Sequence, residues 1–233
     1  MAFWNRLRRR NVTIADLVDY GDPNKKFDGR SIDVDAAAQG IGASKSAVRN
    51  AISAARSAFS NTVLRAFASR SGADVSKDAT VRGMLQAAYG KGPRGAAVNT
   101  KAAAHDLGVS PQTVRRWAAG KQQPSPEHLK AVKASARKTT GTAAGRKRTT
   151  DEFRRTKAGK KKITITGLQG PGGSEYMRDR TIAFDLTDED LHEMLRAYEG
   201  GGDDGFRDWL TGKAGSAYVG GWEFGSIDEF DME

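Results

Sequence analysis

The chain contains no cysteine, which excludes disulfide bonds and thiolate metal ligands and fits a reducing environment. Histidine is also scarce, and the spacing of His105, His128 and His192 matches no metal-ligand pattern. No apolar run approaches the roughly 20 residues that a membrane span needs. We therefore expect no metal, no cofactor and no membrane partner, and we expect a cytoplasmic protein.

Apolar residues make up only 38% of the chain, whereas globular proteins contain about 45 to 50%. Part of the chain is therefore expected to bury little surface and to serve as a linker or tail. The net charge of +10 is unevenly spread, because residues 187–233 hold thirteen acidic and only three basic residues. The residues before them therefore carry a charge of +20. A basic body suits DNA phosphates, and an acidic end suits a protein partner.

Residues 99–120, NTKAAAHDLGVSPQTVRRWAAG, carry the local signals of a helix-turn-helix. Asn99 or the threonine after it can cap a first helix, and Gly108 supplies a turn residue that tolerates positive φ. Ser110 then caps a second helix, which begins at Pro111, where no amide hydrogen is needed. These signals predict two helices joined by a tight turn.

The second of these helices is expected to lie in the major groove of DNA. Val114 and Trp117 would pack on the first helix, which leaves the polar and basic side chains outside. An ordinary helical hairpin with a solvated basic face is the alternative. Under the DNA-binding interpretation, the contacting residues are Ser110, Gln112, Thr113, Arg115, Arg116 and Lys121.

The motif occurs a second time, 66 residues earlier in the chain. Residues 36–50, AAAQGIGASKSAVRN, match residues 102–116, AAAHDLGVSPQTVRR, at seven of fifteen positions. We interpret the match as a repeat of the fold. This copy either contacts DNA through Lys45 and Arg49, or is a packing copy that has lost its reading role.

A strongly basic stretch follows the helix-turn-helix region. Residues 130–162 contain thirteen Lys or Arg, two acids and few large apolar side chains, so residues 136–162 are predicted to be a basic linker. Beyond it, KITITGL and RTIAFDL alternate as strands do, and TDEDLHEMLRAYEGG opens with capping-box spacing. A further helix at DDGFRDWL and an extended aromatic end complete the chain.

These patterns predict a multidomain protein with an all-α helix-turn-helix DNA-binding region, duplicated if the repeat is structural, and a small acidic α+β C-terminal domain. The expected units are residues 1–75 with the first repeat, 76–135 with the helix-turn-helix, the linker at 136–162, and the acidic domain at 163–233.

The order of motifs resembles that of the telomere terminal-protein family of linear actinobacterial, Streptomyces-type chromosomes and plasmids. The segment KAAAHDLGVSPQTVRRWAAGK is similar to the helix-turn-helix of that family. The segments MRDRTIAFDLTDEDLHEMLRAYEGG, FRDWLTGKAG and VGGWEFGSIDEFD then follow, like its strand, two helices and acidic aromatic end. The resemblance covers roughly residues 80–233, and residues 1–75 lie outside it.

The resemblance implies a protein that caps telomeres and primes the DNA synthesis that patches their ends. In that role a side-chain hydroxyl accepts the first deoxynucleotide, and the protein stays covalently bound to the 5′ end. The implied partners are telomeric DNA (a 3′ overhang or duplex), a DNA polymerase and a telomere-associated loading protein. The chain would be the acceptor in this reaction and not the catalyst, so we do not expect it to be an enzyme.

The family carries the priming hydroxyl in a Gly-Pro-Thr-type loop before a strand. The corresponding loop here is LQGPGGSEYMRD, in which Ser174 takes the place of the threonine. Tyr176 is the second candidate, followed by Thr166 and Thr164. Each of these residues has the alternative of being a turn or strand residue without chemistry.

Two other classes of function remain open from the sequence. A helix-turn-helix transcriptional regulator would use the acidic domain either for oligomerisation, which would make it a homo-oligomer, or as an effector module. A nuclease would need carboxylates that hold magnesium, such as Asp203 with Asp204 or Asp188 with Asp190. The position of these pairs near helix starts favours a simpler role in complementing helix dipoles.

Overall fold

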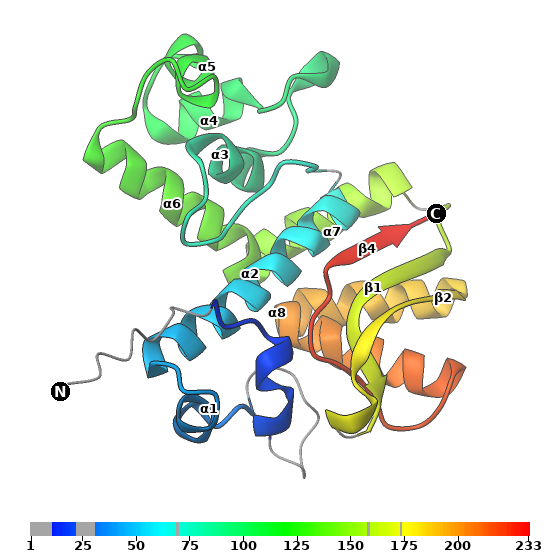
Figure 1. Cartoon of the computed structure of the whole chain (residues 1–233). Helices are drawn as coiled ribbons and strands as arrows, with labels where there is room; N and C mark the ends of the chain where they lie inside the picture. Colours follow the sequence, from blue (N-terminus) through cyan, green and yellow to red (C-terminus); the bar gives the residue numbers. More distant parts are fainter. Residues whose placement is uncertain (1–10, 22–30, 69, 158, 173) are drawn as a thin grey trace, which may run out of the picture.

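The computed structural model describes residues 11–21, 31–68, 70–157, 159–172 and 174–233 (Figure 1). The helical elements are η1 (Ala15–Tyr20), α1 (Val34–Gly40), α2 (Lys45–Ala68), α3 (Val81–Tyr89), η2 (Pro93–Gly95), α4 (Thr100–Leu107), α5 (Pro111–Ala118), α6 (Pro126–Gly141), α7 (Ala143–Lys157), η3 (Ser174–Tyr176) and α8 (Asp188–Ala217). The strands are β1 (Lys162–Pro171), β2 (Arg178–Asp185), β3 (Trp222–Phe224) and β4 (Glu229–Met232). Within these residues, no helix is long and apolar enough to cross a membrane.

Helix α2 links all three hydrophobic clusters of the described chain. Near its start, Val48 packs in a small cluster with η1 and α1. Further along, Leu64 joins the cluster built by α3, α4, α5 and α6, while Phe59 and Phe67 join the cluster between α7, α8 and the sheet. The second half of α2 is therefore buried on most sides, and the helix packs against each of the other parts of the fold (Figure 1).

The sheet is antiparallel, with β1 in its centre. Strand β2 pairs along one side of β1, while β3 and β4 pair along the other side. Ile163 and Ile165 of β1 are fully buried, and their cross-strand partners include Ile182 and Phe230. This alternation confirms the strands expected from KITITGL and RTIAFDL, because one face of the sheet is buried against helices.

The two helices expected after β2 form one kinked element, α8. Its start is the predicted capping box, in which the side chains and backbone amides of Thr187 and Asp190 bond to each other. The kink lies at Gly202, whose φ of 64° and ψ of −146° are not helical. A glycine is needed there because other residues rarely adopt this conformation.

The segment predicted to be a basic linker is helical instead, and it is packed into the fold. Residues 136–162 include the end of α6, all of α7 and the start of β1. Phe153 is 0% exposed and belongs to the cluster under the sheet. Gly145, Thr149 and Phe153 lie four residues apart on one buried stripe of α7. Lys147, Arg148 and Arg155 are exposed on the other faces of α7, so the basic composition of the segment did not indicate that one face is buried.

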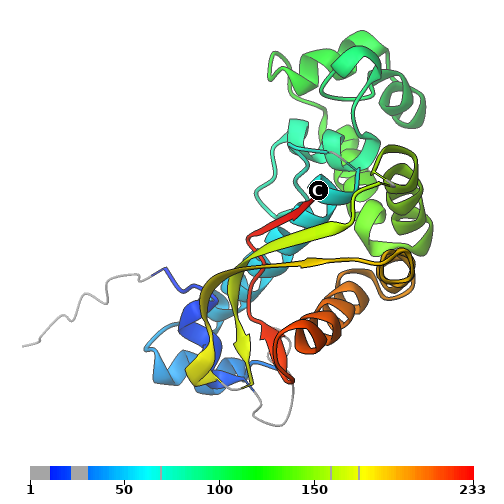
Figure 2. The same ribbon diagram turned by 90° about the vertical axis from the view of Figure 1, so that its right-hand side faces the viewer.

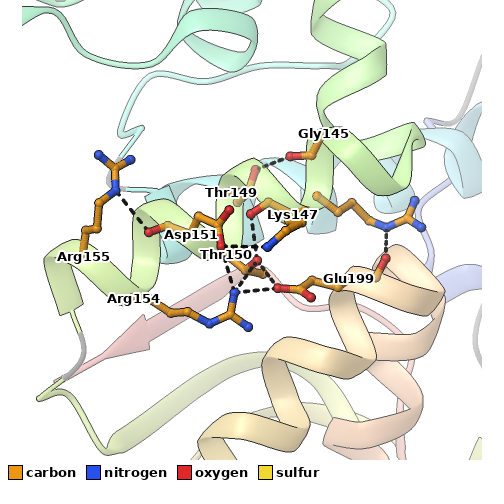
Figure 3. Close-up of polar contacts among 9 residues, drawn as sticks. Gly145, Lys147, Thr149, Thr150, Asp151, Arg154, Arg155 and Glu199 are labelled. Carbon is orange, nitrogen blue, oxygen red and sulfur yellow. Dashed lines mark hydrogen bonds and ion pairs between the residues drawn. The ribbon is translucent and has the colours of Figure 1, made fainter.

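Polar side chains clamp α7 to α8 (Figure 3). The Glu199 carboxylate accepts hydrogen bonds from Thr150 Oγ1 and from Arg154 Nη1, the latter at 2.7 Å. Arg146 Nε donates to the Glu199 carbonyl at 2.9 Å. Burial acts to raise the pKa of Glu199, but the bonds from Thr150 and Arg154 outweigh it and lower that pKa. The clamp therefore favours the ionised carboxylate.

The expected boundaries near residues 75 and 163 do not separate hydrophobic cores. The cluster under the sheet contains Phe59 and Phe67 from the N-terminal part and Phe206 and Phe230 from the C-terminal part. The rings of Phe67 and Phe206 lie 5.2 Å apart between centroids. The expected fold class holds in its coarser form, since a helical region with a helix-turn-helix stands beside a small antiparallel sheet.

Candidate nucleic-acid interface

Helices α4 and α5 are joined by the tight turn that the sequence predicts. Asn99 caps α4, its side chain accepting the Ala102 amide at 3.2 Å. Gly108 follows in the left-handed region, with a φ of 64°. Ser110 caps α5, its Oγ accepting the Thr113 amide at 3.1 Å. These caps fix where both helices begin and how sharply the chain turns between them.

The inward face of α5 is held by its neighbours. Val114 is 0% exposed and Trp117 is 4% exposed, and both pack in the cluster with α3, α4 and α6. The Trp117 ring also lies 5.4 Å from the His128 ring, between centroids. The Nδ1 atom of His128 is 2.9 Å from Ser125 Oγ, a structural contact at the start of α6. The orientation of α5 is therefore set by packing.

The outward face of α5 carries the predicted DNA-binding side chains. Gln112, Arg115, Arg116 and Lys121 are exposed, and none of the three cations forms an ion pair with another described residue. Arg115 Nη1 donates to Gln112 Oε1 at 3.3 Å. The Ser110 and Thr113 hydroxyls lie 2.9 Å apart and bond to each other, which gives them a capping role.

Three cations beside α5 were missed by the sequence analysis. Arg82 at the start of α3, Arg94 in the η2 turn and Lys101 in α4 line one groove with Arg115. The groove has a volume of about 600 Å³. Arg94 adopts a left-handed conformation with φ 58° and ψ 32°, which is strained for a residue with a Cβ atom. For Arg94, the signal in the sequence was the charged turn KGPRG at residues 91–95, shortly before the motif.

Comparison with known families gives one match, and its position coincides with this geometry. The helix-turn-helix family HTH_3 matches residues 100–132, which span α4, α5 and the first part of α6. Helices α4 and α5 form a DNA-binding helix-turn-helix. No curated protein and no solved structure matches the chain. The match covers a small part of the sequence, so it assigns DNA binding to this unit alone.

The residues named for the first repeat lie far from this unit in the fold. Lys45 and Arg49 are exposed on the first turns of α2, at the opposite end of the molecule from α5 (Figure 1). Lys45 Nζ forms an ion pair with Asp35 Oδ2 at 2.8 Å. The structure therefore does not bring the two sets of predicted DNA-binding residues together on one surface.

The four candidate priming hydroxyls divide into two groups. Ser174 and Tyr176 lie in the short turn η3 between β1 and β2, and Tyr176 is 47% exposed. Thr164 and Thr166 lie within the central strand β1, on the face away from Ile163. The Thr166 hydroxyl is 2.9 Å from the Thr181 hydroxyl on β2. The strand threonines are therefore held in the sheet, whereas the turn residues lie at its end.

The carboxylates of the nuclease alternative are engaged in structural contacts. Asp188 pairs with Lys161 at 2.8 Å, and Asp190 pairs with Lys213 at 2.7 Å while it completes the capping box. Asp203 accepts a hydrogen bond from a serine of α2, and burial raises its pKa. Among the described residues, no cluster of His, Asp or Glu could hold a metal ion.

Proposed function

We propose that this protein is a DNA-binding regulator whose helix α5 lies in the major groove. The observation that carries the proposal is the α4–α5 unit itself, with its helix-turn-helix family match and its exposed basic face. Gln112 and Arg115 have side chains of the types that bond base edges. The remaining cations, on α5 and along the adjacent groove, have the chemistry for phosphate contacts that fix the register of the helix on DNA.

The sheet and α8 would then serve as the module for oligomerisation or for an effector. Residues 187–233 of this half hold thirteen acidic and three basic residues, a balance that repels DNA and suits a protein partner. The large hydrophobic side chains that stand exposed in the described chain, Tyr176, Tyr218 and Val219, belong to the same half. These exposed side chains are the apolar groups of this module that a protein partner could cover.

The proposal is tested by selecting bound sequences from a pool of random duplexes and then measuring the affinity of the protein for the selected sequences at a fixed salt concentration. Replacing Arg115 or Arg116 with Ala should weaken binding by about 5- to 150-fold if that residue reads a base. Arg196→Ala is the matched control, because it removes one exposed positive charge from the acidic half. Equal affinities for all variants would refute the assignment of α5.

A second candidate function is protein priming at the ends of linear DNA. One observation favours it: Tyr176 and Ser174 lie in a turn at the end of the sheet, and the tyrosine side chain is 47% exposed. A hydroxyl that must enter the active site of a polymerase needs such access. The polymerase would supply the metals and the catalysis, a loading protein would bring it to the telomere, and this chain would supply the acceptor oxygen.

The two candidates are separated by incubating the DNA-bound protein with a cell extract and labelled deoxynucleotides. Priming predicts a covalent label on the protein, which mass spectrometry would map to Ser174 or Tyr176. Ser174→Ala and Tyr176→Phe would then identify the acceptor, because one of them should abolish labelling. A preparation that binds DNA and stays unlabelled in an active extract would contradict priming and leave the regulator.

A further inference from the structure

The α1–α2 corner repeats the turn glycine and the serine cap of the α4–α5 unit. Gly42 has a φ of 67° where Gly108 has 64°. Ser44 Oγ accepts the amide hydrogen three residues later at 3.1 Å, and Ser110 Oγ does the same at 3.1 Å. The chain therefore contains two corners with the same capping chemistry, and only the second lies within the family match.

The inward positions of the two corners also agree. In each, two alanines on the first helix and one valine on the second helix are buried and hold the helices together. Backbone bonds match as well, since the amide after the turn glycine donates to the second alanine's carbonyl at 2.9 Å in one corner and 3.0 Å in the other. The matched buried residues are Ala37, Ala38 and Val48 in the first corner and Ala103, Ala104 and Val114 in the second.

The outward face of the first corner is exposed and polar. Ser46, Arg49 and Asn50 point away from the buried positions of α2 and are exposed. Arg49 forms no ion pair with another described residue. Lys45 is paired with Asp35, but both side chains are more than half exposed, at 56% and 68%. A surface pair of this kind contributes little stability, so Lys45 can exchange its partner for a phosphate.

We propose that α1 and α2 form a second DNA-contacting helix-turn-helix, with Arg49 as its main phosphate ligand. This inference rests on the proposed function of α5. Polar and basic side chains at the start of the second helix, on a helix fixed by the same turn, have the chemistry that recognises duplex DNA. The unit carries fewer cations than α5 and has Asp35 nearby, so it contributes the weaker contact of the two.

The two units would hold separate stretches of DNA. They lie at opposite ends of the molecule in both views (Figure 1 and Figure 2), and their buried residues belong to two separate hydrophobic clusters. The second contact would therefore fall on a different turn of the same duplex or on a second duplex.

The inference is tested with the full chain and a random-sequence duplex of about 60 base pairs, long enough to span several turns. Affinity is measured over a range of salt concentrations, and the slope of log K against log salt falls by about 0.9 for each lost phosphate contact. Arg49→Ala should lower that slope by about 0.9, and Arg49→Lys should restore it. Arg196→Ala, with the same charge change, should leave it unaltered.

A slope for Arg49→Ala equal to that of Arg196→Ala would overturn the second unit. Arg115→Ala in the same assay separates this outcome from a failure of the proposed function. If Arg115→Ala weakens binding and Arg49→Ala has no effect, the second unit is refuted and DNA binding by α5 stands. Whether Arg49 contacts the same duplex as α5 or a second one is tested by immobilising one duplex and adding a second, labelled duplex. If only protein with Arg49 intact retains the label, the second contact is to a second duplex. If Arg49→Ala lowers the slope but no label is retained, the second contact is to another turn of the same duplex.

Discussion

Replacing Phe153 with Ala tests whether α7 is a structural part of the fold or a basic tether. The side chain is 0% exposed, and its ring lies 5.4 Å from the Phe67 ring of α2, between centroids. Truncating a buried phenylalanine to alanine costs about 3 to 5 kcal/mol, because apolar contacts are lost and a cavity remains. A chain of this size would lose about 2 to 4 °C of Tm for each kcal/mol, so Tm should fall by about 6 to 20 °C.

The measurements are urea unfolding for the free energy and thermal unfolding for Tm, both followed by circular dichroism, with Arg155→Ala as the control on the same helix. Arg155 is exposed, and its Nε donates to the Asp151 carbonyl within α7. Its replacement should change the free energy of unfolding by no more than about 0.5 kcal/mol. If Phe153→Ala were as mild as this control, α7 would not be packed against α2, and the reasoning about the core would be refuted.

Three further predictions concern charge and strain. Burial raises the pKa of Asp203, so the stability linked to its proton is present at low pH and is lost as pH rises through the folded pKa. Asp203→Asn should therefore raise Tm at pH 7, and the gain should shrink toward pH 4. A lower Tm at pH 7 would contradict this prediction. Glu199 has a pKa below its ordinary 4.5, so its clamp stabilises the folded state above pH 4.5, and this stability is lost as pH falls through the lowered pKa. Glu199→Gln should lower Tm at pH 7 and flatten the acid limb of the plot of Tm against pH. An unchanged acid limb would argue against the clamp. Arg94→Gly should relieve left-handed backbone strain worth about 1 kcal/mol. The same change should lower the slope of log K against log salt for DNA binding by about 0.9. A slope equal to that of the wild-type protein would show that Arg94 does not contact DNA.

The helix-turn-helix was predictable because its signals are local. Asn99, Gly108 and Ser110 each determine the conformation of their own few residues, and the structure confirms all three positions. The strands and the capping box at Thr187 were predictable for the same reason, since alternation and caps act over short distances. No tertiary information was needed for any of these elements.

Helix α7 was not predictable from composition, because its inward stripe contains small and polar residues. Thr149 is buried and bonds the Gly145 carbonyl at 3.3 Å, so its hydroxyl is satisfied within the helix. A Cβ atom at Gly145 would meet the carbonyl oxygens of Lys138 and Thr139, which shows how closely α7 follows α6. Only Phe153 supplies a large apolar side chain, and a single one gives no period to detect.

The sharing of one core by the two ends of the chain is a long-range feature. Phe59, Val63 and Phe67 recur in the sequence at the four-residue spacing of a helix face, but this spacing does not indicate which surface covers them. The structure places them against the sheet and α8. Part of the interface was missed for a similar reason, since Arg82 and Arg94 reach the groove beside α5 only through the packing of α3 and the η2 turn.

The most direct test of the central claim, that α5 reads DNA, is a comparison of sequence preference between the wild-type chain and Gln112→Ala. Gln112 is exposed on the outward face of α5 and is uncharged, so its loss should not change the number of counterions that DNA binding releases. Selection from random duplexes should show that the variant loses preference at one or two adjacent base pairs while its salt slope stays that of wild type. A preference identical in both proteins, or none in either, would contradict the claim.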